Sequence, residues 1–500
     1  MPDAPSVGIA FETDRIRSLV EQTLKNIQLS KQLVALICVA LALATFFLNP
    51  LGIKPEAAKV IAIAVLMIGL WVTEAMPMPA VALLPLVLFP LVGVAPIDVT
   101  ASSYANPVVF LFMGGFMLGL AIEKWNLHRR IALNIVRATG TSGDRIILGF
   151  IIATGLISMW LSNTATTMMM FPIALSVVKV IGENHSNKQG VSHFAMSIMI
   201  AIALASNFGG IATLIGTPPN VAYAGFINKK YGTTIPFADW FLVCAPLSGL
   251  LLYFLYLVMV KWLYPNGMKS DETTQGVINR EITALGAYTT PEKRVFAVFL
   301  CTATLWMTKD LVNRLGLVKL DDNMIAILAG TSLFIIPSGQ ADKPLLDWAD
   351  TKNMAWGILL LFGGGIALAG ALEKAGLIEQ LGQWFAGFGL NPLLLIFLVT
   401  LVSLFISEVM SNVAQVIVFA PVVTGLAEAM HMNPLLLGIP MTLAASCASM
   451  LPMGTPPNAI AFSSGYIKLK DMTRVGFVMN IISVILITLF CWLLLPVVFE

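Results

Sequence analysis

The chain contains eleven apolar stretches, most of them about as long as a membrane-spanning helix. They lie at about 33–49, 57–75, 78–95, 107–124, 192–226, 238–264, 292–309, 323–337, 354–373, 434–463 and 474–499. A helix needs about 20 apolar residues to cross the hydrocarbon core of a bilayer. Only 11% of the residues are charged, which is too few to cover a water-facing surface. We therefore predict an all-α polytopic membrane protein with about 11 transmembrane helices, and exclude soluble enzymes and nucleic-acid binders.

Two further apolar stretches, 145–182 and 392–430, are too long for a single spanning helix. Small polar residues interrupt each of them near the middle. Non-helical backbone at membrane depth is stable only when protein buries it or water reaches it. The pattern predicts two re-entrant hairpins, each made of two half-helices that meet at a tip inside the membrane.

The distribution of Lys and Arg indicates which side of the cell inner membrane each segment faces. We trace the chain through the membrane from a cytoplasmic N-terminal tail over residues 1–32. This path places 21 Lys and Arg residues inside and 8 outside. Such a bias follows the preference for positive charge in cytoplasmic segments. The polar stretch 265–291 becomes a cytoplasmic linker, and the C-terminus lies outside. The basic run from Lys124 to Arg137 is expected to bind lipid headgroups.

Three sequence elements occur twice in the same order. Phe110 to Leu127 resembles Leu360 to Leu377, and the Ser-x-x-x-Ser-Asn pattern at 158–163 recurs at 407–412. The sequence Gly-Thr-Pro-Pro-Asn at 216–220 is repeated at 454–458. An odd number of spans separates the copies, which predicts an inverted repeat. Secondary transporters use such repeats to open toward each side of the membrane in turn.

The repeated elements are the ones that interrupt the helices. Each Pro-Pro pair removes backbone donors and leaves carbonyl oxygens free to coordinate a cation. Ser and Asn side chains add neutral oxygen ligands that suit Na⁺. Helix N-termini that restart after a break favour an anion. Lys and Arg are absent from 146–178, 200–228, 391–430 and 432–467, so co-bound cations are the simplest compensation for a buried anion.

Other classes of function remain as alternatives at this point. Glu408 is either a proton or cation site or a structural acid. A channel or a membrane-embedded enzyme is disfavoured, because the five Cys and four His residues are dispersed and show no metal-ligand spacing. A Na⁺-independent dicarboxylate exchanger differs from a symporter only in how transport is driven.

At these motifs the chain resembles the divalent anion/sodium symporter family, bacterial dicarboxylate transporter type. The resemblance rests on Ser162-Asn163-Thr164, on Ser411-Asn412-Val413, on both Gly-Thr-Pro-Pro-Asn sequences and on Thr73-Glu74-Ala75-Met76-Pro77. It implies an elevator-type homodimer. The scaffold would comprise residues 33–142 and 292–384, and the transport domain residues 143–264 and 385–499.

The same resemblance implies the ligands. One Na⁺ would be bound by Ser158, Ser162, Asn163 and Gly216, and a second by Ser407, Ser411, Asn412 and Gly454. Substrate carboxylates would contact Asn163, Thr164, Asn412, Val413, Thr217 and Thr455. Val413 stands where many members have Thr, and Gln415 is the candidate for the missing donor. The expected function is Na⁺-coupled symport of succinate, malate or fumarate, with citrate or sulfate as alternative substrates.

Overall fold

The structure is a computed structural model that describes residues 30–50, 52–184, 187–268, 272–316, 318–340, 343–377 and 391–499. Ten helices in these ranges are long and apolar enough to cross a membrane. Apart from one bridge between Pro337 and Pro344, the described residues form no β-structure. The prediction of an all-α polytopic membrane protein is confirmed. Residues 1–29 of the predicted tail and the predicted boundary at 384/385 lie outside the described residues.

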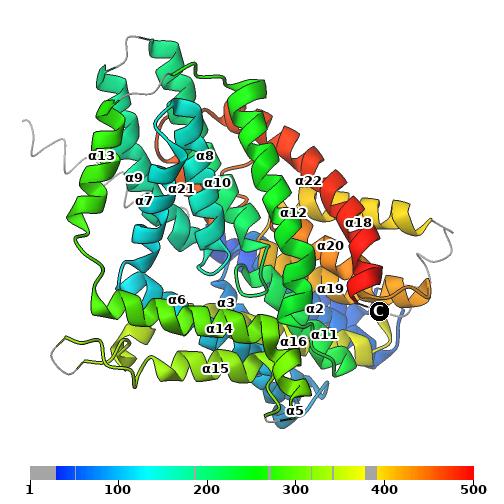
Figure 1. Ribbon diagram of the computed structural model, residues 1–500. Helices are drawn as coiled ribbons and strands as arrows, with labels where there is room; N and C mark the ends of the chain where they lie inside the picture. The colour runs from blue at the N-terminus through cyan, green and yellow to red at the C-terminus, as the bar shows by residue number, and fades with distance from the viewer. Residues whose placement is uncertain are drawn as a thin grey trace, which may run out of the picture.

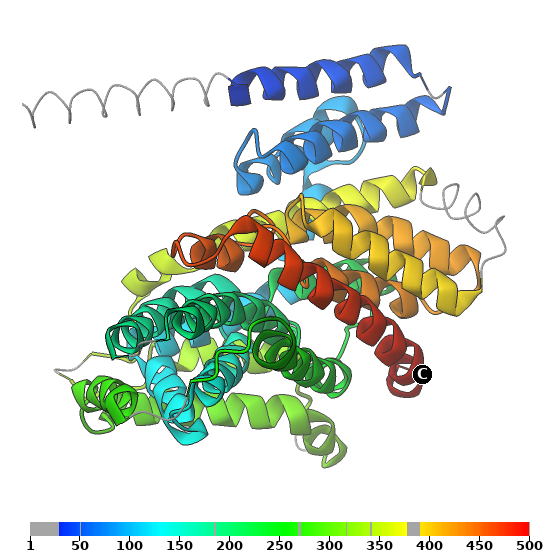
Figure 2. The same cartoon turned by 90° about the horizontal axis from the view of Figure 1, so that it is seen from above.

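The first helices form one edge of the molecule. Ser30–Leu48 lies beside α2 (Pro55–Thr73), where Cys38 packs against Gly69 (Figure 2). The stretch 78–95, predicted as one span, instead forms the short helices α3 (Met78–Val81) and α4 (Leu84–Val92). Pro85 explains the break, because it lies in the first turn of α4 and has no N–H group to continue a helix from α3, whereas Pro90 lies inside α4. After α5 (Ile97–Ser102) and η1 (Ser103–Ala105), α6 (Pro107–Lys124) completes this region.

The first long apolar stretch contains a break where the sequence predicts one. Helix α7 (Leu127–Thr139) leads into α8 (Gly143–Ser158), and α9 (Asn163–Asn184) follows the break. Helix α10 (Lys188–Gly210) is the most buried of the candidate spans among the described residues. A second break separates α10 from α11 (Pro218–Tyr231). Helix α12 (Phe237–Leu257) continues as the π-helix η2 (Val258–Leu263).

The second half of the chain is also helical (Figure 1). Its elements are α14 (Thr290–Arg314), α15 (Asp322–Ser332), η3 (Trp348–Asn353), α16 (Trp356–Lys374), α18 (Pro392–Ser407), α19 (Asn412–Ala429), α20 (Leu435–Ala445), α21 (Pro456–Phe462) and α22 (Leu469–Val498). The predicted span 323–337 is reduced to α15, which has 11 residues. The chain then turns, and Pro337 ends the apolar run in the bridge with Pro344.

Each of the two interrupted stretches forms two helices separated by a turn. Helices α8 and α18 have 16 residues each, whereas α9 and α19 have 22 and 18. Pro172 and Pro421 lie inside α9 and α19 without ending them. The turns at 159–162 and 408–411 nevertheless fall where the polar residues predict them.

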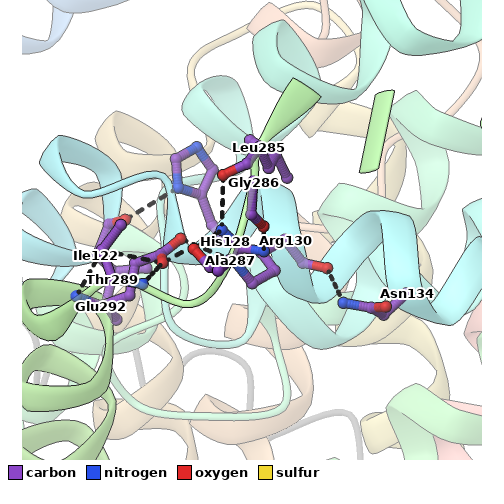
Figure 3. Close-up of polar contacts among 9 residues, drawn as sticks. All are labelled: Ile122, His128, Arg130, Asn134, Leu285, Gly286, Ala287, Thr289 and Glu292. Atoms are coloured by element: carbon purple, nitrogen blue, oxygen red, sulfur yellow. Dashed lines mark hydrogen bonds and ion pairs between the residues drawn. The ribbon is translucent and has the colours of Figure 1, made fainter. Parts of the chain in front are cut away.

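The segment predicted as a linker contains a helix, α13 (Glu272–Ala284), which one ion pair joins to α7. Arg129 pairs with Glu281. Arg130 is only 4% exposed and donates to Glu292 at 2.8 Å and to the carbonyl oxygens of residues 285–287 (Figure 3). Arg130 is therefore buried against the linker and the start of α14, so this residue of the basic run is not free to bind lipid headgroups as the sequence suggests.

Candidate ion and substrate site

In the first half, the turn between α8 and α9 is held against the end of α10. The hydroxyl oxygen of Ser158 lies 2.9 Å from Oδ1 of Asn163 and 2.7 Å from the carbonyl oxygen of Ser206. Ser158 is fully buried, whereas Asn163, the first residue of α9, is half-buried. The Thr213 hydroxyl donates to the carbonyl oxygen of Met159, which ties the turn to the break after α10.

Two glycines allow oxygen atoms to converge on this turn. A Cβ atom on Gly210 would lie 2.3 Å from Oδ1 of Asn163. A Cβ atom on Gly216 would lie 2.4 Å from the carbonyl oxygen of Gly210 and 2.9 Å from that of Met159. Any larger residue would displace these groups. Backbone and amide oxygens are thereby gathered next to the predicted ligands, and the carbonyls of Met159 and Gly210 are candidates that the sequence analysis missed.

The asparagine that ends each Gly-Thr-Pro-Pro-Asn sequence binds the break that precedes it. Nδ2 of Asn220 lies 2.9 Å from the carbonyl oxygen of Thr213 and 3.5 Å from that of Gly210. Nδ2 of Asn458 lies 3.1 Å from the carbonyl oxygen of Leu451 and 3.4 Å from that of Ala448. In both halves the acceptors lie seven and ten residues upstream. The repeated sequence therefore produces a repeated local geometry.

The second half presents the same pair of side chains. The hydroxyl of Ser407 lies 2.8 Å from Oδ1 of Asn412, and it also binds the carbonyl oxygen of Ala445. Gly454 is buried, and a Cβ atom there would lie 3.4 Å from the carbonyl oxygen of Leu451 and 3.6 Å from that of Glu408. The oxygen-rich environment of the first half is thus repeated, with more room around the glycine.

Glu408 is a structural acid in this arrangement. Its carboxylate, only 3% exposed, accepts hydrogen bonds from the backbone N–H groups of Ser449, Met450 and Leu451 at 2.8 to 3.1 Å. It also accepts a bond of 2.6 Å from Nδ2 of Asn480. Both carboxylate oxygens are used, so Glu408 fixes the loop between α20 and α21. Of the two roles left open by the sequence, the structural one fits these contacts.

Gln415 does not supply the donor that Val413 lacks. Its side-chain amide is fully buried, and Nε2 donates to the carbonyl oxygen and to the hydroxyl of Ser403, both at 2.7 Å. Both N–H groups therefore point into the contact between α18 and α19. The expectation that Gln415 faces a substrate is wrong for this arrangement, because Ser403 on α18 lies within reach.

Asn207 connects the two halves. Its Oδ1 lies 3.4 Å from Nδ2 of Asn163, and its Nδ2 lies 3.1 Å from the hydroxyl oxygen of Thr455 and 3.4 Å from Oδ1 of Asn458. The sequence analysis missed this residue. The available signal is the polar pair Ser206-Asn207 shortly before the break between α10 and α11, inside an otherwise apolar helix.

The remaining predicted residues lie on the same turns and helix starts. Thr217 and Thr455 are buried and precede the first residues of α11 and α21. Thr164, Ser411 and Val413 are half-buried. Ser162 is exposed, and its hydroxyl accepts a bond from the backbone N–H of Ala165 at 3.2 Å. Ser162 therefore contributes to the start of α9 in this arrangement, whereas Ser158 and Asn163 are in mutual contact.

The donor set fits a small alkali cation better than a transition metal. It consists of hydroxyl, amide and carbonyl oxygens, which are ligands for hard cations. Asn220 Oδ1 is buried without a hydrogen-bond partner in the described structure, so one further oxygen is available beside this cluster. Helices α9 and α19 begin at Asn163 and Asn412, and their N-termini favour negative charge.

Comparison with known proteins finds related transporters over almost the whole chain. A family model described as the sodium:sulfate symporter transmembrane region matches residues 28–498. The sodium-dependent dicarboxylate transporter SdcS of Staphylococcus saprophyticus is 38% identical over 475 residues, covering 93% of this chain and 92% of that protein. The protein of the same name from Staphylococcus aureus is 38% identical over 464 residues, covering 91% and 89%.

Solved structures share the fold at low identity. The Alcanivorax borkumensis YdaH transporter gives a TM-score of 0.53 at 13% identity, over 78% of this chain and 86% of that one. Neisseria gonorrhoeae MtrF, described as an antimetabolite efflux pump, gives 0.53 at 12% identity, over 79% and 83%. The broken helices and paired polar turns define a multi-pass membrane transporter, not an enzyme. The chain belongs to the sodium:sulfate symporter family, the divalent anion/sodium symporters that its motifs resemble.

Proposed function

We propose that this protein is a Na⁺-coupled symporter of C4-dicarboxylates such as succinate, malate and fumarate in the cell inner membrane. The family supports transport, and relatives at 38% identity are named sodium-dependent dicarboxylate transporters. The observation that carries the proposal is the pair of Ser–Asn turns, each beside a glycine-lined break, together with Asn207, which links the first turn to the break of the second half.

In this proposal Na⁺ is a transported ion and not a resident cofactor. One ion would be held by Ser158, Ser162, Asn163 and Gly216, and a second by Ser407, Ser411, Asn412 and Gly454. The contacts of Ser158 with Asn163 and of Ser407 with Asn412 support these assignments. Neutral ligands leave the charge of each ion uncompensated, so a dianion next to them is favoured.

The dicarboxylate would lie between the two turns, in contact with Asn163, Thr164, Asn412, Val413, Thr217 and Thr455. No Lys or Arg occurs in the sequence around either turn. Positive charge would come from the two ions and from the N-termini of α9 and α19. Substrate affinity would therefore depend on Na⁺ concentration, which is the physical basis of coupling.

The membrane arrangement forms the second part of the proposal. The halves would be an inverted repeat, with the N-terminus inside and the C-terminus outside. Residues 143–264 and 385–499 would move as the transport domain of an elevator against a scaffold of 33–142 and 292–384 in a homodimer. The turns of both interrupted stretches contact breaks in the middle of long apolar segments, which supports re-entrant hairpins.

Uptake of succinate into proteoliposomes tests the proposal. Accumulation should require an inward Na⁺ gradient and should be lost when K⁺ replaces Na⁺. Equal uptake in K⁺ would identify a Na⁺-independent exchanger and refute the symport proposal. Competition by succinate, citrate, 2-oxoglutarate and sulfate then ranks the substrates. Stronger competition by citrate or sulfate than by succinate would contradict the C4-dicarboxylate assignment.

A further inference from the structure

A cleft of about 290 Å³, separate from the Ser–Asn turns, lies beside the C-terminal ends of α11 and α16, in the region where Figure 1 labels these helices close to α2 and α5. Three lysines from three helices line it: Lys59 of α2, Lys229 of α11 and Lys374 of α16. Most of the other lining residues are apolar, among them Val60 and Phe89. The cleft thus combines positive charge with apolar walls.

The three lysines have unused donors. Within the described residues none of them forms an ion pair, whereas Lys124 and Lys309 do. Lys59 donates to the carbonyl oxygen of Val92 at 3.0 Å, and Lys229 lies 3.4 Å from the hydroxyl oxygen of Ser102. An ammonium group has three N–H donors. At least two donors on each lysine therefore remain for water or a ligand.

The charge in the cleft is unbalanced. Glu56 is the one carboxylate among its lining residues, against three ammonium groups. Like charges that share a cleft with low-dielectric walls repel each other and attract counter-ions. An anion would relieve this repulsion, and an apolar portion of the same molecule would be covered by Val60 and Phe89.

We propose that this lysine cleft binds an organic anion that has one or two oxyanion groups and an apolar body. A dicarboxylate has this chemistry, and so does the headgroup region of an anionic lipid. The cleft shares no residue with the proposed Na⁺ and substrate sites. If the ligand is a dicarboxylate, the cleft would concentrate it on the outer side of the membrane, a step that rests on the proposed function and orientation.

Amine footprinting tests the cleft without relying on transport. The full-length protein is placed in Na⁺-free phosphatidylcholine nanodiscs and treated with a short pulse of acetylating reagent, with and without succinate. Mass spectrometry then measures the acetylation of each lysine. Succinate should slow modification of all three cleft lysines, of which Lys229 and Lys374 are exposed and Lys59 is half-buried, by about fivefold, as expected for exposed charge pairs. Lys319, exposed and predicted to face the same side, is the internal control.

A second set of nanodiscs separates the two sources of the anion. Protection that appears with phosphatidylglycerol and without succinate identifies a lipid headgroup, and protection only with succinate identifies a dicarboxylate. Either result supports an anion site. Unchanged modification in both sets, or equal slowing at Lys319, overturns it.

Variants that neutralise lysines inside and outside the cleft locate the site. Lys229→Gln combined with Lys374→Gln should remove the protection of Lys59, whereas Lys319→Gln should leave it intact. Persistent protection of Lys59 in the double variant would place the anion elsewhere and refute the proposal. The wild-type footprint requires no variant to fold. Since it is measured without Na⁺, it can succeed even if Na⁺-coupled uptake fails, which distinguishes the two proposals.

Discussion

The two halves of the candidate site have the same hydrogen-bonding pattern in their turns, but different side chains hold each turn in place. In both halves a Ser hydroxyl lies within 2.9 Å of an Asn amide oxygen five residues later. In the first half, Thr213 in the break donates to the carbonyl oxygen of Met159 in the turn. In the second half the break again donates and the turn accepts, but the side chain belongs to the turn, where the Glu408 carboxylate accepts from backbone N–H groups in the break.

This difference separates the groups that would bind ligands from the groups that support them. The repeated residues, such as Asn163 and Asn412, provide the oxygen atoms. The groups that hold the turns in place are chemically unrelated. At equivalent positions, the first half uses the backbone carbonyl of Met159 and the second half uses the carboxylate of Glu408. A carboxylate with three backbone donors makes a stronger support than one neutral hydroxyl bond. The second half should therefore be more sensitive to loss of its support than the first.

Removal of the repeated ligands should have the largest effect. Asn163→Ala and Asn412→Ala should each lower Na⁺-dependent succinate uptake by about 100-fold or more, because each removes an amide oxygen from a proposed ion site. Uptake into proteoliposomes at equal protein content measures this. Asn134→Ala on α7, whose amide binds the carbonyl oxygen of Arg130, is the matched control (Figure 3). Wild-type Na⁺ dependence in both site variants would contradict the ion assignments.

Loss of Glu408 should weaken Na⁺ binding more than loss of the Thr213 hydroxyl. Glu408→Gln places an NH₂ group against backbone N–H donors and should raise the Na⁺ concentration for half-maximal uptake by about 30-fold, from a loss of about 2 kcal/mol. Thr213→Val removes one neutral hydrogen bond and should cost about 1 kcal/mol, or about fivefold. Na⁺ titrations of uptake measure both. A larger effect at Thr213 than at Glu408 would reverse the comparison.

Asn207 should determine whether the halves act together. Asn207→Ala removes the contacts with Asn163 and Thr455, so Na⁺ affinity should fall about fivefold and the Hill coefficient for Na⁺ should decrease. Ser206→Ala is the neighbouring control, because Ser206 Oγ contacts Thr167 and Ala203 and not the second half. An unchanged Hill coefficient in Asn207→Ala would mean that the halves bind ions independently.

Much of this arrangement is predictable from local chemistry. Apolar runs predict membrane helices because lipid requires internally satisfied backbone. The polar pairs at 162–163 and 411–412 and both proline pairs predict the breaks. Short helices α3 and α4 are harder to foresee, since three prolines there lie in an apolar run that resembles a span.

Contacts between distant segments are not predictable from the chain alone. Gln415 could face a substrate by sequence position, but Ser403, 12 residues earlier, binds both of its N–H groups. Arg130 lies in a basic run typical of a lipid-facing helix, yet Glu292, 162 residues later, buries it. The packing of helices that are distant in the sequence determines where Gln415 and Arg130 point. A single sequence does not show which helices pack together.

Val413 provides a smaller test of the difference between the halves, because Thr164 is its counterpart in the first. Val413→Thr adds a hydroxyl donor near the start of α19 and should change the preference between succinate and citrate by about threefold, within the range for one hydrogen bond. Na⁺ affinity should stay within twofold of wild type, or about 0.4 kcal/mol. Competition assays at saturating Na⁺ measure this. A change in Na⁺ affinity with unchanged anion preference would place Val413 away from the substrate.

The smallest expected effect concerns Lys124 and Lys374, the repeated lysines at the ends of α6 and α16. Lys124 donates to Asp350 at 2.7 Å, whereas Lys374 lines the lysine cleft and forms no ion pair within the described residues. Partial burial acts to raise the pKa of Asp350, but the bonds from Lys124 and the backbone N–H of Asp347 outweigh it, so this pKa lies below its usual value. The pair thus stabilises the fold above the unfolded-state pKa of about 4, and this contribution is lost as pH falls through the lower folded-state value.

Thermal unfolding of the purified protein measures this contribution. Lys124→Gln should lower stability at neutral pH by about 1 kcal/mol or less, and the difference from wild type should vanish under acidic conditions. Lys374→Gln should show no such convergence, because Lys374 forms no ion pair with a carboxylate in the part of the chain that the structure describes. If both variants gave the same pH dependence, the repeated lysines would be equivalent in the folded protein, and the asymmetry between the two halves would be confined to Glu408 and its loop.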